Sequence, residues 1–364
     1  MKVKRSLFVI VLVGLFSLCY FVMNQHYDEL ARYPHELSEK QRALVLKYLN
    51  TDGINMLISQ KIEPDEFLPY IEIEGFDIAN TLWYDRAYHT QTENITKDFI
   101  VRFINKYKNQ LSYSTLGETI TNYSFNSLIR FYDEGDQYQN GTILLPNPSY
   151  MYTLIGNKQT VYTYEPSNLV SVGTLPHRSI VKGAKDVLIK EEVLAPLQQL
   201  CTAAEDINGI TCGNMSIVAG YLSYEDQVNL YDIAQEVYKE KGLTMYWDYP
   251  GHSEYQLGYT IQLLPNEMKP EVNGNKTDEK DTNDEVDSNE ETQENVSEQE
   301  REQEIWLKDN AYKYGFILRY PKGEEETTGK YYQAYTLRYV GREMAKEIHD
   351  KNLVLNEVNF SKYE

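Results

Sequence analysis

The sequence predicts an α+β fold for residues 181–364, with a small sheet and helices packed on it. Short β-branched and apolar runs at 215–219 and 259–264 are typical of buried strands. In segments such as 191–204, by contrast, apolar residues recur at helical spacing. We therefore expect strands and helices to share one C-terminal domain.

Composition limits the classes of function. The chain has 364 residues, enough for a membrane segment with two modest domains, or for one domain with large additions. Its net charge of −20 argues against a nucleic-acid partner, because phosphate binding needs clustered lysines and arginines. Its 32 tyrosines fit either ring packing on a hydrated surface or stacking on glycan or peptide.

The chain begins with a basic and then an apolar segment. Residues 1–5 are basic, and residues 6–23 form an apolar run of about the minimum length that spans a bilayer. We predict an uncleaved membrane anchor over residues 1–24. The positive flank would stay cytoplasmic, which places the rest of the chain outside the cell membrane. A cleaved signal peptide is the alternative, although a poor cleavage site follows the run.

Residues 28–180 form the predicted N-terminal region, which is mixed and partly helical. Ser38 and Gln41 form a capping box at the start of a helical segment that continues to Leu49. Further amphipathic segments follow, and the region contains no metal, nucleophile or phosphate motif. We expect a spacer or packing region.

In the C-terminal region, the expected elements follow one another closely. Residues 191–204 read as a helix and 215–219 as a strand, after which Ser223 caps a second helix, with Asp226 three residues on. Cys201 and Cys212 either pair or stay as buried thiols, and the sequence does not decide between these states. Residues 269–304 are strongly acidic and polar, so we predict a disordered insert within the domain.

Four stretches of this region resemble one peptidase family. The stretches 220–227, 249–263, 306–322 and 332–341 are similar to motifs of the VanY-type D-alanyl-D-alanine carboxypeptidases, peptidase family M15B. The third is the most specific, because the family's Trp-Leu-x-x-Asn-Ala-x-x-Tyr-Gly-Phe-x-x-Arg-Tyr-Pro is matched nearly throughout. The resemblance implies an M15/hedgehog-like peptidase fold with a small, mainly antiparallel sheet. It also implies a zinc site and peptidoglycan stem peptides as substrates.

The zinc-binding positions of that family are substituted in this chain. The family motif Ser-x-His-x-x-Gly-x-x-x-Asp supplies two zinc ligands, and a later His supplies the third. This chain keeps Ser253 and Gly258 of the motif. At the three ligand positions it has Tyr255, Gln262 and Thr336.

Two more functional positions differ from the family pattern. Gln333 stands at the position of the family's catalytic glutamate, and Leu222 at that of an arginine that grips the substrate carboxylate. Phenol, amide and hydroxyl groups are not usual zinc ligands, and an amide takes up no proton near neutral pH. We therefore expect no catalytic residue, no metal and no cofactor.

The resulting hypothesis is an inactive carboxypeptidase-like protein at the bacterial cell surface. It would bind a peptidoglycan stem peptide or a cell-envelope protein in the inherited groove, while His252 would be a hydrogen-bonded structural residue. The residues expected to form the groove are Ser223, Gln227, Ser253, Tyr255, Gln333 and Arg338. Two alternatives remain: a structural or assembly protein without a cell-wall ligand, and an active zinc D,D-carboxypeptidase with unusual ligands.

Overall fold

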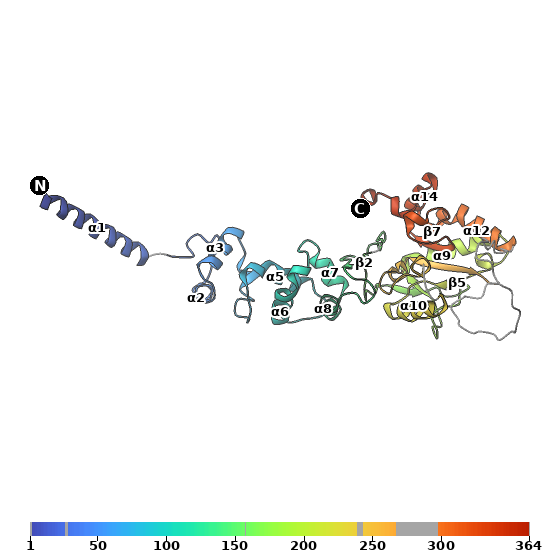
Figure 1. The fold of residues 1–364 in the computed structure, drawn as a ribbon, viewed down its shortest axis with the longest axis horizontal. Coiled ribbons are helices and arrows are strands. Elements are labelled where there is room, and N and C mark those ends of the chain that lie inside the picture. The colour runs from blue at the N-terminus through green and yellow to red at the C-terminus, as the bar shows by residue number, and fades with distance from the viewer. Residues whose placement is uncertain (1, 26–27, 157, 239–242, 267–297, 364) are drawn as a thin grey trace. The chain divides into compact units, whose positions relative to one another are not determined.

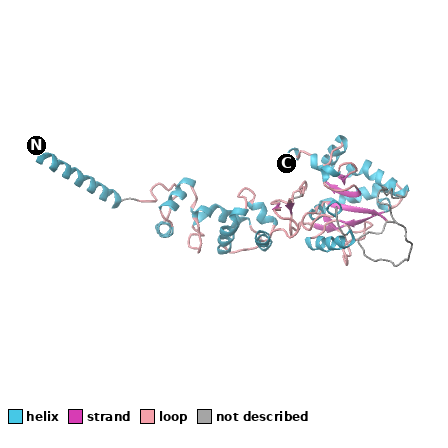
Figure 2. Ribbon diagram, viewed as in Figure 1, coloured by secondary structure: helices cyan, strands magenta, loops and turns pink. Residues whose placement is uncertain are grey.

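The computed structural model describes residues 2–363, except 26–27, 157, 239–242 and 267–297. It divides into two compact units, residues 1–121 and 122–364. Residues 122–180 thus cluster with the C-terminal segment and help to build its core. Figure 2 shows that the described strands all belong to the second unit.

The described part of the first unit is helical. Ser38 caps α2, and its side chain accepts a hydrogen bond from the Gln41 backbone, which confirms the capping box. A buried cluster that includes Leu30, Val45 and Phe67 forms a core for this unit. The elements are α1 (Lys2–Gln25), α2 (Glu39–Tyr48), α3 (Thr51–Gln60), α4 (Pro64–Phe67), η1 (Ile78–Asn80), α5 (Thr81–Thr90), α6 (Lys97–Tyr107), η2 (Lys108–Gln110) and α7 (Leu116–Asn122).

The prediction of a membrane anchor over residues 1–24 is wrong, and so is the membrane location derived from it. In the part of the chain that the structure describes, no helix combines the length and the apolar character needed to cross a bilayer. Helix α1 is long, but its apolar run lies between Arg5 and Asn24 and is interrupted by Gly14 and Ser17.

The second unit is built around a four-stranded antiparallel sheet, in agreement with the expected α+β fold (Figure 1). The strand order is β5 (Met215–Ala219), β6 (Thr260–Pro265), β8 (Gln333–Tyr339) and β7 (Phe316–Tyr320). Two small pairs accompany it: β1 (Ile143–Leu144) with β2 (Gln159–Thr160), which is parallel, and β3 (Leu169–Ser171) with β4 (Leu188–Lys190), which is antiparallel.

Helices cover the sheet through separate apolar clusters. Ile317 of β7 packs with Met344 and Ile348 of α14. Val218 of β5 packs with Leu230 of α10. The helical elements of this unit are α8 (Phe125–Glu134), α9 (Glu191–Ala203), η3 (Ala204–Asp206), η4 (Thr211–Asn214), α10 (Tyr224–Tyr238), α11 (Leu243–Tyr246), η5 (Glu254–Leu257), α12 (Glu298–Asn310), η6 (Ala311–Tyr314), α13 (Glu325–Thr328), α14 (Arg342–Lys351), η7 (Leu355–Glu357) and η8 (Phe360–Lys362).

The acidic insert predicted over 269–304 lies mostly outside the described residues. The last part of the insert, residues 298–304, is described and is helical, because α12 begins at Glu298. Gln303 is fully buried and donates a hydrogen bond to the Gly213 carbonyl oxygen (2.7 Å). Packing of the helix against its neighbours therefore orders a segment whose composition alone suggested disorder.

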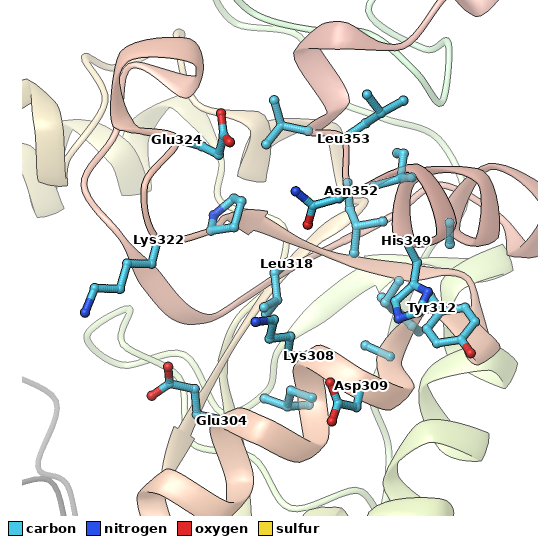
Figure 3. A pocket seen from close by; sticks show the side chains of 18 of the residues that line it. Glu304, Lys308, Asp309, Tyr312, Leu318, Lys322, Glu324, His349, Asn352 and Leu353 are labelled. Atoms are coloured by element: carbon cyan, nitrogen blue, oxygen red, sulfur yellow. The ribbon is translucent and has the colours of Figure 1, made fainter.

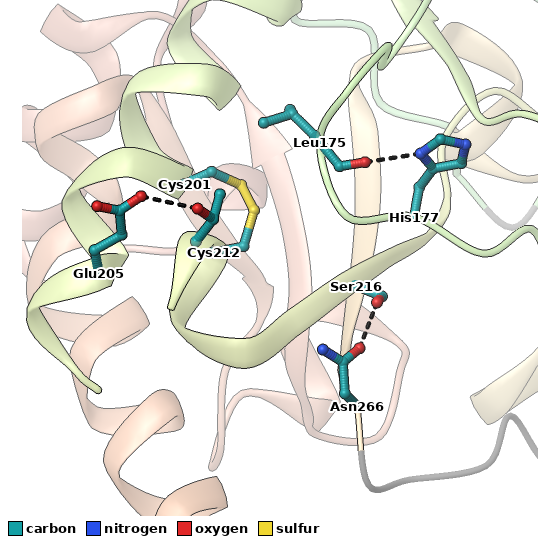
Figure 4. Close-up of a disulfide and its surroundings, with 8 residues drawn as sticks. Leu175, His177, Cys201, Glu205, Cys212, Ser216 and Asn266 are labelled. Carbon is teal, nitrogen blue, oxygen red and sulfur yellow. Dashed lines mark hydrogen bonds between the residues drawn. A yellow bond between two sulfur atoms is a disulfide. The ribbon is translucent and has the colours of Figure 1, made fainter. Parts of the chain in front are cut away.

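Cys201 and Cys212 form a disulfide (Figure 4). The sequence alone did not decide whether these two residues pair. Cys201 lies in the last turn of α9 and Cys212 in η4, and both are fully buried. The bond joins the end of the helix to the segment that leads directly into β5. It therefore fixes one edge of the sheet to a covering helix.

Candidate functional site

A pocket of about 200 Å³ brings together most of the substituted family positions. It lies where η5, β6 and β8 approach the start of α10 and the segment 243–248, which we call the cover segment. The lining residues are Leu222, Gln227, Leu230, Tyr246, Trp247, Asp248, Ser253, Tyr255, Gln262 and Gln333. Four of the six residues predicted to form the groove are among them; Ser223 and Arg338 are not.

A tight turn presents Tyr255 to this pocket. Ser253 begins η5, and its hydroxyl accepts a hydrogen bond from the Tyr255 backbone N–H (3.4 Å). Gly258 ends η5 with φ +78°, a backbone conformation that residues other than glycine rarely adopt. A Cβ atom there would also lie 2.9 Å from Cγ of Lys190. These two motif residues therefore have a local structural purpose.

The three residues predicted to stand at the family's zinc-ligand positions lie close together in the structure. Gln262 and Thr336 are direct partners on the neighbouring strands β6 and β8. The Tyr255 hydroxyl lies 3.4 Å from Thr336 Oγ1, and Thr336 donates a hydrogen bond to Gln333 Oε1 (2.7 Å). Tyr255, Thr336 and Gln333 thus form one hydrogen-bonded group, and Gln262 lies beside it as the strand partner of Thr336.

This group does not fit a zinc ion. Burial raises the pKa of Tyr255, so its phenol is neutral and a poor donor to a cation. Amide and hydroxyl oxygens supply the other two positions, whereas zinc sites in proteins are built from imidazole, thiolate and carboxylate. Among the residues with described positions, no three His, Cys, Asp or Glu side chains lie close enough to hold a metal ion.

The wall formed around Leu222 is apolar. Leu222 is 5% exposed and belongs to a cluster with Val218 and Leu230. Trp247 and Tyr255 pack against that cluster. A hydrocarbon surface therefore surrounds Leu222, the residue predicted to replace the family's arginine.

Gln227 and Ser223 serve the scaffold around the pocket. The Gln227 amide donates to the Leu222 carbonyl oxygen (2.9 Å) and to Gln256 Oε1 (2.8 Å), and its own oxygen accepts from the Gly251 N–H (3.0 Å). Ser223 caps α10 through Asp226, as predicted, with 2.7 Å between its hydroxyl and the carboxylate. The hydrogen bonds of both side chains are therefore made to other groups of the protein.

Arg338 lies two residues after Thr336 on β8 and is completely buried, and it belongs to a charged group that sequence reasoning missed. Its guanidinium donates to the Met151 carbonyl oxygen (2.8 Å) and Thr260 Oγ1 (3.2 Å) and lies 3.9 Å from Glu254. Glu254 in turn accepts two hydrogen bonds from Arg319, at 2.7 and 2.8 Å. Burial raises the pKa of Glu254, but Arg319 more than offsets this and holds the pKa below its usual range.

His252 forms a second buried pair, with a partner far along the chain. Its Nε2 lies 2.7 Å from Asp136 Oδ2, and the two side chains are 6% and 4% exposed. Burial raises the pKa of Asp136, yet the hydrogen bond to His252 brings it below its ordinary value. The expectation of a hydrogen-bonded structural histidine agrees with this geometry.

The cover segment is held by residues just before β8. Lys330 forms an ion pair with Asp248 (2.5 Å) and donates to the Thr244 carbonyl oxygen. The Tyr331 N–H donates to the Met245 carbonyl oxygen (3.1 Å). The aromatic run Tyr246-Trp247 was the one signal in the sequence that could have indicated this wall.

A larger cavity, of about 330 Å³, lies elsewhere, between α12, β7 and α14 (Figure 3). Tyr312 and His349 stack at its edge with ring centroids 3.7 Å apart. None of the substituted family positions lines this cavity. We take the smaller pocket as the candidate site because the motif residues converge there.

Comparison with known proteins places these features in a family. The model of the VanY D-alanyl-D-alanine carboxypeptidases matches residues 186–342. The provisionally named carboxypeptidase YodJ of Bacillus subtilis (strain 168) is 31% identical over 223 residues, which are 60% of this chain and 70% of that protein. This chain belongs to the VanY family.

Other members of the family and solved structures are also similar to this chain. The D-alanyl-D-alanine carboxypeptidase of Enterococcus faecalis (strain ATCC 700802 / V583) is 29% identical over 150 residues, 39% of this chain and 46% of that protein. The structure of the LdcB LD-carboxypeptidase is 28% identical, with a TM-score of 0.45, over 61% of this chain and 91% of its own. The structure of a point mutant of the vancomycin resistance D,D-pentapeptidase VanY in complex with Zn(II) is 23% identical, with a TM-score of 0.39. The match covers 57% of this chain and 97% of that one.

Proposed function

We propose that this member of the VanY family binds a cell-wall peptide in the pocket around Tyr255 and does not hydrolyse it. The observation that carries the proposal is the convergence of Tyr255, Gln262 and Thr336, which offers no imidazole and no charged oxygen to a metal. The scaffold motifs of the family are kept, whereas the groups that would perform its chemistry are replaced.

Hydrolysis of a peptide bond by a zinc enzyme needs two things that these residues do not supply. Zinc must be held so that the pKa of its bound water falls to about 7. A base must then accept the proton from that water. Gln333 stands near the substituted positions, but its amide oxygen already accepts a hydrogen bond from Thr336 (2.7 Å) and takes up no proton near neutral pH.

Several features support binding. The pocket combines an apolar wall with the amide groups of Gln262 and Gln333, and such a mixture suits a small peptide ligand. The relative in Enterococcus faecalis is named for D-alanyl-D-alanine, which makes a stem peptide the first ligand to test. The buried disulfide is typical of proteins that work in oxidising compartments.

Binding and turnover can be measured on the same samples. The probes are a stem peptide that ends in D-alanyl-D-alanine and the same peptide with a C-terminal amide. Isothermal titration should give saturable binding of at least one form, and Gln262→Leu should weaken it. Gln198→Leu, the same change on the exposed face of α9, should leave it unchanged. No D-alanine should be released, with or without added zinc.

Two results would refute the proposal. Release of D-alanine that zinc stimulates and a chelator abolishes would identify an active enzyme with unusual ligands. Absence of binding by both peptides would favour a structural or assembly protein, or a protein partner from the cell envelope.

A further inference from the structure

The pocket contains no positive charge to receive a carboxylate. Among its lining residues, all of which the structure describes, none is lysine, arginine or histidine. The charged lining residue is Asp248, which is itself an anion. Lys330 pairs with Asp248 (2.5 Å) but does not line the pocket, and its ammonium also serves the Thr244 carbonyl oxygen.

Uncharged hydrogen-bonding groups do reach the pocket. Gln262 is partly exposed there, and its side-chain amide makes no hydrogen bond to another described residue. Gln333 uses its oxygen to accept from Thr336 and keeps its NH₂ group free among the described residues. Together these two side chains offer donors and an acceptor, which is the complement of a peptide amide group.

The opposite wall is suited to hydrocarbon. Leu222 and Leu230 are 5% and 3% exposed, and Trp247 packs against them. A carboxylate placed against this wall would lose its water without gaining a counter-ion, which is unfavourable in a low-dielectric site. The carboxylate of Asp248 would repel it further.

We infer that the pocket selects a peptide whose terminal carboxyl is blocked as an amide, and that it rejects the free carboxylate. This inference rests on the proposed binding function and names its ligand class. In the cell wall, a stem peptide whose D-alanine carboxyl is engaged in an amide cross-link has this chemistry. The apolar wall would receive the alanine methyl group, and Gln262 and Gln333 would bind the amide.

The test compares the dissociation constants of the two peptides, free acid and C-terminal amide, for the intact chain. The amide should bind at least about tenfold more tightly, a difference of about 1.4 kcal/mol. Leu222→Arg should reverse the preference, because a guanidinium at this wall can pair with a carboxylate in two hydrogen bonds. Leu222→Met, which keeps an uncharged side chain of similar volume, should retain the preference for the amide.

The outcomes separate the two proposals. Stronger binding of the free acid to the wild-type chain would overturn the inferred ligand class, while the proposed binding function would stand. A failure of both peptides to bind would overturn the binding function, and the inference would fall with it. A preference for the amide that Leu222→Arg does not diminish would contradict the role assigned to this wall. Circular dichroism of each variant checks that it is folded.

Discussion

The Tyr255 hydroxyl lies 3.4 Å from Thr336 Oγ1, so the side chains at two of the positions that we predict to correspond to the family's zinc ligands are hydrogen bonded to each other. Thr336 is fully buried, and its hydroxyl donates a hydrogen bond to Gln333 Oε1. Tyr255 is therefore the donor in the first bond, and the three residues form one chain of hydrogen bonds. This arrangement satisfies the buried hydroxyl groups without a cation.

If the assignment of the substituted positions is correct, restoring them should create a metal site. The five-fold variant Leu222→Arg, Tyr255→His, Gln262→Asp, Gln333→Glu and Thr336→His should bind one zinc ion per chain, because it places three usual zinc ligands on converging elements. Competition with a chromophoric chelator measures the affinity. The same variant without Thr336→His is the control and should bind zinc much more weakly. A folded five-fold variant with no zinc affinity would show that the positions are misassigned.

The buried pair of Glu254 and Arg319 should be essential for stability. Glu254→Gln removes the anion between two buried guanidinium groups and should lower the free energy of unfolding by about 3–5 kcal/mol. The matched control is Glu134→Gln, because Glu134 forms an exposed ion pair with Arg130 (3.5 Å). This substitution should lower the free energy of unfolding by less than about 1 kcal/mol. Urea denaturation followed by tryptophan fluorescence measures both. Equal effects of the two substitutions would contradict the structure.

Stability should decrease in acid because of Asp136 and Glu254. The pKa of each lies below its ordinary value in the folded protein, so the unfolded chain binds protons first as the pH falls. The stability that each contributes is complete above its unfolded pKa of about 4 and is lost as the pH falls through the folded pKa. Unfolding curves between about pH 6 and pH 3 should show this loss. In the Asp136→Asn variant, the free energy of unfolding should change less steeply with pH. An unchanged slope would exclude Asp136 as a cause of the acid sensitivity.

The disulfide should stabilise the second unit. Cys201 and Cys212 are separated by 11 residues, and closing a loop of this length in the unfolded chain contributes about 3 kcal/mol. The double variant Cys201→Ala and Cys212→Ala should therefore be less stable by about this amount in urea denaturation. Dithiothreitol should destabilise the wild-type chain and leave the double variant unaffected. A wild-type chain that is insensitive to reduction would contradict the prediction.

Local sequence patterns predicted the elements that depend on neighbouring residues. The capping box at Ser38, the helix that begins at Glu191 and the strand 215–219 all occur as expected. Gly315 ends the helical segment before β7 with φ +88°, a conformation that favours glycine. In each case the signal lies in the residues of the element itself or directly beside it.

The buried charged pairs could not be predicted from such local patterns. Arg319 lies 65 residues from Glu254, and Asp136 lies 116 residues from His252. No periodic pattern joins such partners, since strand pairing and loop packing bring them together. The cover segment was missed for the same reason, because its contacts with Lys330 and Tyr331 cross a similar distance in sequence.

The central claim is that the converged positions no longer hold zinc, and the most direct test is the zinc content of the wild-type chain. Tag-free protein is dialysed against buffered zinc, and its metal content is then compared with that of Tyr255→Phe and Gln262→Ala variants. We predict that the wild-type chain retains no more zinc than these variants. One tightly held zinc ion per wild-type chain, lost in both variants, would contradict the account.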